Sequence, residues 1–208
     1  MAIYLFDVDG TLTRAKSRID PSFANQFLKW MEDKEVYIVS GGSFTRIIDQ
    51  LGMNIVEKTQ GVFACMGNIF YQQREQVNSS GMDEWEIIYE NKFIPPKNLY
   101  RSLNSYVSKS GYHTKTGNHH EVRVGMLNFS IVGRNATTEQ RKEYEEYDAE
   151  IGERERIVAN LRKKYTQMDF VIGGAVSIDI FNTGNDKSQI IERYFEEALE
   201  HNQIHFAG

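Results

Sequence analysis

The sequence predicts an α/β fold with a parallel sheet in its core and an inserted α+β domain. Strand-like and helix-like segments alternate at the start of the chain, and the same alternation returns near its end. Between these parts lie several strand-like segments and a long charged helical stretch. Alternating strands and helices form parallel sheets with right-handed crossovers. We therefore expect a core of residues 1–78 and 182–208 and an inserted domain of residues 79–181.

The core elements are predicted from apolar runs and from helical spacing. Short apolar runs bounded by turn residues are typical of buried strands, and apolar residues three or four positions apart are typical of amphipathic helices. We expect core strands at residues 2–8, 36–39 and 204–206, and core helices at residues 21–34, 44–51 and 190–195.

The inserted domain is expected to begin after a linker at residues 78–81, which read Asn-Ser-Ser-Gly. Thr137 and Gln140 form a capping-box pattern, and the charged helix that follows is expected to reach about Tyr165 with a break at Gly152. The other expected elements are strands at residues 85–93, 122–132, 170–172 and 176–181, and a helix at residues 99–107.

The composition argues against several classes of protein. The 208 residues carry a formal net charge of −5, which disfavours a general nucleic-acid binder. No apolar run approaches the ~20 residues of a membrane-spanning helix. The one cysteine, Cys65, fits a reducing compartment. We therefore expect a cytoplasmic protein with neither a nucleic-acid nor a membrane partner.

Two carboxylates after the first expected strand are the strongest chemical signal. Asp7 and Asp9 would lie at the carboxyl edge of the sheet, where open α/β sheets bind ligands. Asp7 is suited to attack a phosphoryl group, and Asp9 to move a proton on or off the substrate oxygen. Because a carboxylate repels a phosphate dianion, we expect Mg²⁺ with oxygen ligands from both residues. The competing interpretation, an acidic turn, is disfavoured by the preceding strand and the trailing Thr-Leu-Thr.

Two further segments are expected at the same edge of the sheet. Ser40 and Gly41 end the second expected strand, and a hydroxyl with free backbone amides before a helix can bind phosphate. Lys187 precedes the last core helix, where its charge would offset those of the phosphate and the nucleophile. Taken alone, the Ser40-Gly41 segment is equally well explained as a helix cap. Lys187, taken alone, is explained as a solvated surface lysine.

In this order, the Asp-x-Asp, Ser and Lys segments resemble the motifs of the haloacid-dehalogenase (HAD) superfamily. The inserted segment further resembles the cap of eukaryotic-type phosphomannomutases. This resemblance implies a HAD-like Rossmannoid core with an α+β cap domain. The residues that carry it are 125–130, 133–134, 138–141, 173–181 and 184–187.

The resemblance also implies substrate-binding residues. Arg123, Arg134 and Arg141 match cap arginines that hold the phosphate group not undergoing transfer, a task for which the planar guanidinium is suited. Lys16 stands where family members have an arginine. The other matching positions contact the sugar hydroxyls or line that site, and they are Met126, Asn128, Ser177 and Asp179.

The activity that the resemblance implies is the interconversion of mannose 6-phosphate and mannose 1-phosphate through an aspartyl-phosphate on Asp7. A hexose 1,6-bisphosphate would be the intermediate and activator, and Mg²⁺ the metal ion. The resemblance also implies a homodimer formed through the cap. Residues 85–93, which are rich in large apolar side chains, are the expected interface.

Two alternative functions stay open. Residues 40–43 read Ser-Gly-Gly-Ser, which is closer to a phosphatase pattern than the family's Gly-Gly-Ser-Asp, so a sugar-phosphate phosphatase with the same nucleophile is one alternative. The sequence stops at Gly208, where superfamily members continue with Gly-Asp and use that aspartate as a Mg²⁺ ligand. Either the sequence is truncated before that aspartate or the metal site lacks it, and in both cases we expect the 208-residue form to bind Mg²⁺ weakly and turn over slowly. The second alternative is an inactive protein that binds sugar phosphate or a protein partner.

Overall fold

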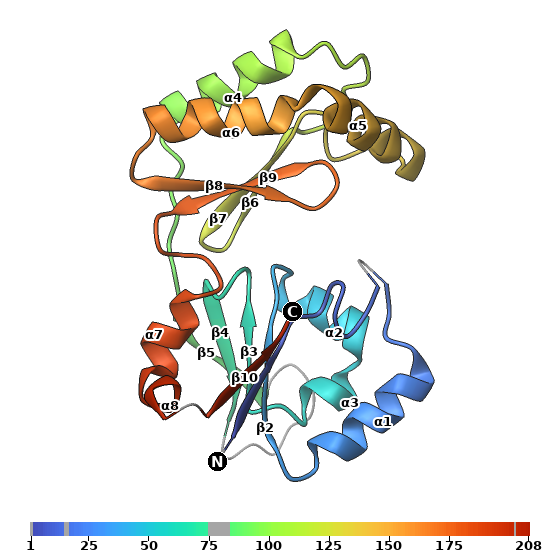
Figure 1. Cartoon of the computed structure of the whole chain (residues 1–208), viewed down its shortest axis with the longest axis vertical. Coiled ribbons are helices and arrows are strands. Elements are labelled where there is room, and N and C mark those ends of the chain that lie inside the picture. The colour runs from blue at the N-terminus through green and yellow to red at the C-terminus, as the bar shows by residue number, and fades with distance from the viewer. Residues whose placement is uncertain (1, 15–16, 75–83, 202) are drawn as a thin grey trace. The chain divides into compact units, whose positions relative to one another are not determined.

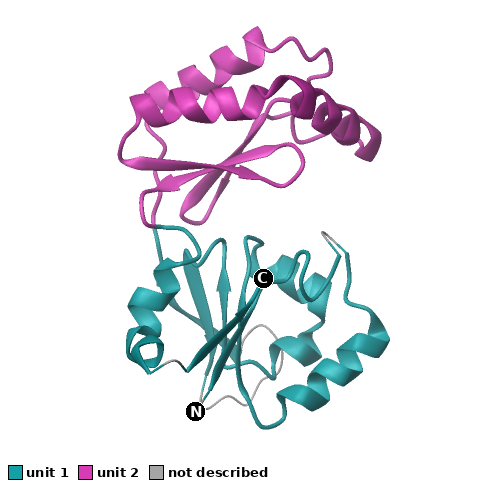
Figure 2. Ribbon diagram, in the orientation of Figure 1, with its two compact units in different colours: residues 1–91, 185–208 teal, residues 92–184 magenta. Residues whose placement is uncertain are grey.

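The chain folds into two compact units in the computed structural model, which describes residues 2–14, 17–74, 84–201 and 203–208. One unit, here called the core unit, comprises Met1–Asn91 and Asn185–Gly208, and the other, the inserted unit, comprises Lys92–Gly184 (Figure 2). The insertion in a discontinuous core was predicted from the sequence. None of the helices in the described ranges is long and apolar enough to cross a membrane.

The core unit is built on one mixed sheet whose strand order, within the described residues, is β10-β1-β2-β3-β4-β5. The pairs β10–β1, β1–β2 and β2–β3 are parallel, and β3–β4 and β4–β5 are antiparallel. The strands are β1 (Ile3–Phe6), β2 (Glu35–Val39), β3 (Gly61–Ala64), β4 (Ile69–Gln73), β5 (Trp85–Glu90) and β10 (Ile204–Ala207). The helices are α1 (Pro21–Met31), α2 (Phe44–Leu51), α3 (Met53–Val56), α7 (Gln189–Tyr194) and α8 (Glu196–Glu200).

Helices cover both faces of this sheet, with α7 and α8 on one side and α1, α2 and α3 on the other (Figure 1). Because successive side chains of a strand point to opposite faces, β1 contributes to both layers. Leu5 packs in a cluster with Ile190 of α7, while Phe6 meets the ring of Phe27 on α1 with centroids 5.1 Å apart. This two-sided burial is typical of a parallel strand in an α/β fold, and it explains the unbroken apolar run before Asp7.

The sequence analysis placed the segment around Trp85 in the inserted domain, but in the structure this segment belongs to the core unit. The strand β5 pairs with β4 of the core sheet, from Gln73↔Trp85 to Ile69↔Glu90, and the two units divide between Asn91 and Lys92. Local composition predicts that a segment forms a strand, but it does not predict which strand will be its partner or in which sheet the strand will lie. The expected linker at residues 78–81 lies outside the described residues.

The inserted unit has its own antiparallel sheet, of order β6-β7-β9-β8 in the described ranges. Leu127 and Phe129 of β7 and Ile178 and Ile180 of β9 face a hydrophobic core that includes Leu161 of α6. The alternate residues of these strands therefore occupy the opposite face. The elements are α4 (Lys97–Lys109), β6 (His120–Arg123), β7 (Met126–Ser130), α5 (Thr138–Ile151), α6 (Glu153–Lys164), β8 (Met168–Gly173) and β9 (Ser177–Asn182).

The predicted capping box and helix break are both confirmed. The Thr137 hydroxyl accepts from the backbone N–H of Gln140, whose side chain accepts from the Thr137 N–H. At Gly152 the backbone turns left-handed, with φ of 64°, and this ends α5 before α6 begins. The charged stretch is thus two helices joined at one glycine.

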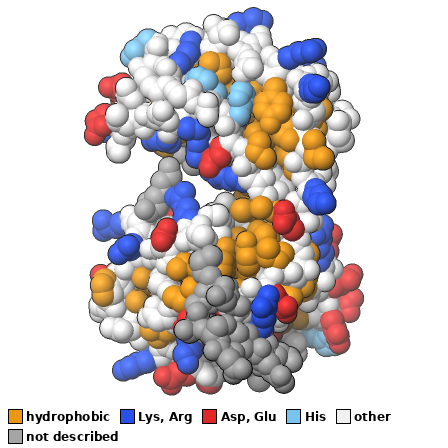
Figure 3. Space-filling model, turned by 180° about the vertical axis from the view of Figure 1, so that it is seen from behind, with side chains coloured by type: hydrophobic (Ala, Val, Ile, Leu, Met, Phe, Trp, Pro, Cys, Tyr) orange, Lys and Arg blue, Asp and Glu red, His pale blue; other side chains and the backbone are white. Residues whose placement is uncertain are grey.

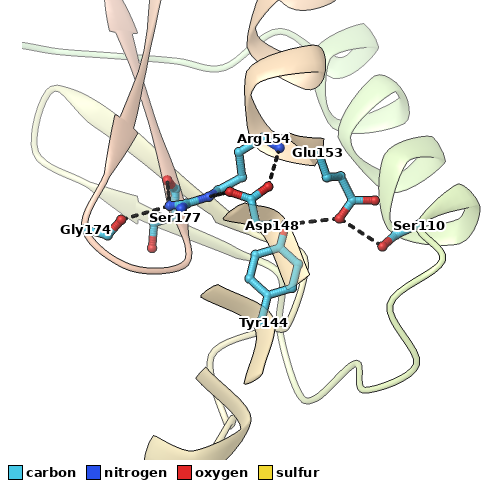
Figure 4. Close-up of polar contacts among 7 residues, drawn as sticks. All are labelled: Ser110, Tyr144, Asp148, Glu153, Arg154, Gly174 and Ser177. Atoms are coloured by element: carbon cyan, nitrogen blue, oxygen red, sulfur yellow. Dashed lines mark hydrogen bonds and ion pairs between the residues drawn. The ribbon is translucent and has the colours of Figure 1, made fainter. Parts of the chain in front are cut away.

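A buried ion pair connects this helix junction to the β8–β9 turn (Figure 4). The Arg154 Nε donates to Asp148 Oδ2 at 2.6 Å, and the Arg154 backbone N–H donates to Asp148 Oδ1 at 2.7 Å. A second guanidinium nitrogen donates to the backbone oxygen of Gly174 at 2.8 Å. Because both side chains are buried, each charge depends on the other for compensation.

Replacement of Arg154 by Met is expected to lower the free energy of unfolding by about 3–5 kcal/mol, since it leaves the carboxylate of Asp148 buried and unpaired. Urea unfolding measures this loss. Lys142→Met is the matched control, because Lys142 forms an exposed pair with Glu146 and such pairs contribute ~0–1 kcal/mol. Equal losses in the two variants would show that the buried pair is not a major stabilising contact.

Candidate active site

The loop after β1 places Asp7 and Asp9 at the carboxyl edge of the parallel strands. Val8 between them is fully buried, which turns the two flanking carboxylates away from the interior. Gly10 has φ of 92° and donates its N–H to the Thr13 oxygen at 2.8 Å, while the Thr13 N–H returns to the Val8 oxygen at 3.0 Å. These bonds close a tight turn that presents both aspartates at the place where open α/β sheets bind ligands.

Lys187 lies against Asp7, although the whole inserted unit separates the two in sequence. The Lys187 Nζ is 2.7 Å from Asp7 Oδ2, and the backbone N–H of Val8 donates to Asp7 Oδ1 at 2.8 Å. Lys187 comes just before α7, which packs on the sheet through Ile190. Both oxygens of Asp7 are therefore oriented, and the lysine charge lies where a phosphoryl group would meet the carboxylate.

Ser40 and Gly41 follow β2, the parallel neighbour of β1, so they lie at the same edge of the sheet as Asp7. The Ser40 side chain is buried, and its Oγ accepts from the Gly42 N–H at 3.1 Å. Ser43, and not Ser40, caps α2 by accepting from the Arg46 N–H at 3.4 Å. The helix-cap explanation of this segment therefore applies to Ser43, and Ser40 orders the turn that precedes it.

Gln50 is a residue of this site that the sequence analysis missed. Its Nε2 donates to Asp9 Oδ1 at 2.7 Å, and it lies 3.3 Å from both Thr13 Oγ1 and the Ser17 carbonyl oxygen. The side chain is buried on α2 next to Leu51. A polar residue on the apolar face of an amphipathic helix was the available signal. This hydrogen bond from the side-chain amide orients Asp9.

A cavity of about 740 Å³ opens beside the Gly10 loop. Arg14, Arg18 and Asp20 are among its lining residues. Lys16, the predicted substrate contact of this loop, lies outside the described residues.

Asp7 and Asp9 are the candidate metal ligands, and their chemistry fits Mg²⁺, which prefers carboxylate and carbonyl oxygens. Asp7 would offer a carboxylate oxygen and Asp9 its backbone carbonyl oxygen. A carboxylate has about four lone-pair sites, so the bonds from Lys187 and Val8 leave acceptor capacity on Asp7. Across the described residues, no group of three or more His, Cys, Asp or Glu side chains is arranged to hold a metal ion.

A second polar cluster lies on the open face of the inserted sheet. Arg123 NH2 is 2.7 Å from Glu121 Oε2, and Arg134 NH2 pairs with the same oxygen. Arg134 NH1 donates to Asn128 Oδ1 at 2.7 Å, and Asn128 Nδ2 donates to Asp179 Oδ1 at 2.6 Å. The strand register predicts this proximity, since Glu121 is opposite Asn128 and Asn128 is opposite Asp179.

The remaining predicted residues of this unit border the cluster. Arg141 donates to the backbone oxygens of Ala136 and Arg134 at 3.1 and 3.2 Å, so its guanidinium lies beside the Arg134 main chain. Met126 is fully buried where β7 begins. Ser177 is opposite Ser130 in the sheet, two residues before Asp179. The structure thus brings together Arg123, Arg134, Asn128 and Asp179, with Arg141 attached through backbone groups.

Comparison with solved structures defines the class of fold. A haloacid dehalogenase-like hydrolase from Bacteroides thetaiotaomicron matches with a TM-score of 0.63 and 14% identity, over 100% of this chain and 81% of that one. A structure from Thermoplasma acidophilum matches with a TM-score of 0.59 and 17% identity, over 100% and 76%. The chain therefore has a HAD-like fold, as predicted.

Sequence comparison defines the family. The sequence model described as eukaryotic phosphomannomutase matches residues 24–208. A phosphomannomutase of Dendrobium officinale is 35% identical over 99% of this chain and 79% of its own length, and one of Saccharomyces cerevisiae is 31% identical over 99% and 79%. The chain belongs to the eukaryotic phosphomannomutase family.

The half-buried carboxyl of Asp179 gives the cluster a pH-dependent stability. Burial raises the pKa of Asp179 above its ordinary value of 3.8, and the bond from Asn128 and the nearby arginines offset this in part. The stability contributed by protonated Asp179 is therefore fully present below about pH 4, and it is lost as the pH rises through the pKa of Asp179 in the folded protein.

Asp179→Asn, which cannot ionise, is expected to gain stability relative to the parent as the pH rises from 4 to 7. Urea titration measures the free energies of unfolding of the variant and the parent. The variant's value minus the parent's is expected to be larger at pH 7 than at pH 4. Asp49→Asn, at an exposed position of α2, controls for the loss of one charge. A difference that stays constant or reverses would contradict the assignment of a raised pKa to Asp179.

Proposed function

We propose that this chain is a phosphomannomutase that interconverts mannose 6-phosphate and mannose 1-phosphate. The observation that carries the proposal is the contact of Lys187 with Asp7 in the core unit of a HAD-like chain of this family. The arginine cluster of the inserted unit supports a substrate with a second phosphate group, since guanidinium groups bind phosphate through paired donors. Relatives in Dendrobium officinale and Saccharomyces cerevisiae carry the same name.

In the proposed mechanism Asp7 carries the phosphoryl group and Asp9 carries the proton. Asp9 takes the proton of the C1 hydroxyl of mannose 6-phosphate while that oxygen attacks phospho-Asp7, which releases the carboxylate and forms mannose 1,6-bisphosphate. After the bisphosphate has turned around, a carboxylate oxygen of Asp7 attacks its other phosphorus atom. The bond from phosphorus to the sugar oxygen breaks, and Asp9 returns its proton to that oxygen, which yields mannose 1-phosphate.

The other residues of the core unit prepare these two carboxylates. Lys187 holds one oxygen of Asp7 and offsets charge at the phosphoryl group. Gln50 donates to one oxygen of Asp9 and so orients this carboxyl group for the proton transfer. Ser40 and Gly41 are proposed to contact the phosphoryl group at the same edge of the sheet. When bound at Asp7 and Asp9, Mg²⁺ would supply positive charge that reduces repulsion between carboxylate and phosphate.

The inserted unit is proposed to bind the hexose phosphate through its polar cluster. Arg123, Arg134 and Arg141 would bind the phosphate group that is not being transferred. Asn128, Ser177 and Asp179 would contact sugar hydroxyls, and Met126 would line their site. A hexose 1,6-bisphosphate, needed to phosphorylate Asp7 initially, is the proposed activator.

We further propose a cytoplasmic homodimer that forms through the inserted unit. Hydrophobic side chains are exposed on the face shown in Figure 3, and the exposed ones of the inserted unit include Ile94, Val122 and Ile172. Their exposure supports an interface because burying large apolar side chains between two subunits is energetically favourable. Residues 85–93 lose their expected role as a cap interface, because β5 belongs to the core sheet.

The mutase proposal predicts that the chain, with Mg²⁺ and a catalytic amount of hexose 1,6-bisphosphate, converts mannose 1-phosphate to mannose 6-phosphate in a coupled assay. Asp7→Asn is expected to lower kcat at least about a thousandfold, since loss of a nucleophile removes the covalent route. Asp33→Asn is the matched control, because Asp33 is exposed and pairs with its sequence neighbour Lys34, away from the carboxyl edge of the sheet.

Release of free phosphate without isomerisation would contradict the mutase and establish a phosphatase. Full activity of Asp7→Asn would contradict the choice of nucleophile.

A further inference from the structure

We propose that Glu121 limits the phosphate affinity of the inserted unit by competing with the bound phosphate for Arg123 and Arg134. The proposal deepens the function proposed above and rests on it, because it takes these arginines to be the phosphate ligands. Glu121 is not among the residues predicted from the sequence. Its effect would be on the affinity for phosphate and on phosphate release.

The geometry gives one carboxylate oxygen two guanidinium partners. Glu121 and Arg123 are two residues apart on β6, so their side chains leave the same face of the sheet. Arg134 arrives from the segment after β7, yet its NH2 reaches the same Glu121 Oε2 that Arg123 NH2 contacts at 2.7 Å. The donors that would bind a phosphate oxygen are thus directed at a protein carboxylate.

Further donors of Arg134 and Arg141 are directed at other protein groups. Arg134 NH1 donates to Asn128, which in turn donates to Asp179, so a second acidic residue stabilises the arrangement. Arg141 donates to two backbone oxygens. A phosphate that binds here must therefore either displace the carboxylate of Glu121 or bind close to its negative charge. Displacement and repulsion both lower the affinity for phosphate.

The exposure of the three side chains favours displacement. Glu121 has 38% of its side chain exposed, compared with 23% for Arg123 and 28% for Arg134. The carboxylate can therefore withdraw into water more easily than either guanidinium, which leaves the arginines in place for the incoming phosphate. Glu121 then acts as a stand-in anion that orders the arginines when no phosphate is bound.

A weak hold on phosphate matches what the proposed reaction demands of this cluster. The bisphosphate must release one phosphate group from the arginines before it can present that group to Asp7. Binding that stabilises a bound intermediate without stabilising the transition state does not accelerate turnover. A competing carboxylate shortens the lifetime of the bound state and keeps the two arginines oriented.

The test compares Glu121→Gln with the parent chain in a titration with inorganic phosphate. The side-chain Nε–H NMR signals of Arg123 and Arg134 report binding at this cluster and not elsewhere. Glutamine retains an acceptor oxygen of similar reach and removes the charge, so the variant is expected to bind phosphate about tenfold more tightly. Its kcat for mannose phosphate interconversion is expected to fall as release slows.

Two control variants isolate the effect of this carboxylate. Glu146→Gln removes the same charge from an exposed pair with Lys142 on α5, and its phosphate affinity is expected to equal that of the parent. Glu121→Asp keeps the charge and is expected to stay close to the parent. Damage to the fold would weaken binding in Glu121→Gln, so tighter binding cannot come from a merely structural role.

Equal or weaker phosphate binding by Glu121→Gln, with both arginine signals still responding, would overturn the competition and leave the proposed phosphate site intact. Failure of phosphate to move either arginine signal, in the parent and in the variant alike, would overturn the phosphate site and this inference together.

Discussion

The ion pair between Asp7 and Lys187 is the interaction on which the candidate active site of the core unit depends. Asp7 directly follows β1, the neighbour of the edge strand β10, and Lys187 lies just after the chain returns from the inserted unit. The pair forms because α7 packs through Ile190 on the same sheet that carries β1. The insertion can therefore interrupt the sequence without interrupting the site, provided that the chain returns to the sheet at this point.

The inserted unit follows a different constraint, the two-residue period of its strands. One face of the sheet buries Leu127, Phe129 and their partners against the helices. The alternate positions carry Glu121, Arg123, Asn128 and Asp179 on the other face, where register brings them side by side. A slip of one residue would exchange the two faces, so the apolar packing also determines which polar groups meet. Arg154 strengthens this arrangement by tying the β8–β9 turn to the helices.

Much of this could be predicted from the sequence because the signals were local. The apolar run before Asp7, the helical spacing of α1 and α2 and the capping box of α5 depend on neighbouring residues alone. The contacts of Gln50 with Asp9, and of Glu121 with two arginines, could not be predicted in this way. Each depends on which elements pack together, as does the pairing of β5 with β4, which the sequence analysis assigned to the wrong unit.

The central claim is that Asp7 carries the phosphoryl group, and chemical trapping of that residue tests it most directly. The chain would be incubated with hexose 1,6-bisphosphate and Mg²⁺, quenched, treated with borohydride and digested for mass spectrometry. Borohydride reduces an aspartyl-phosphate to homoserine, so the account predicts homoserine at position 7 that depends on the bisphosphate. Conversion at another carboxylate, or none in a preparation that interconverts mannose phosphates, would contradict it.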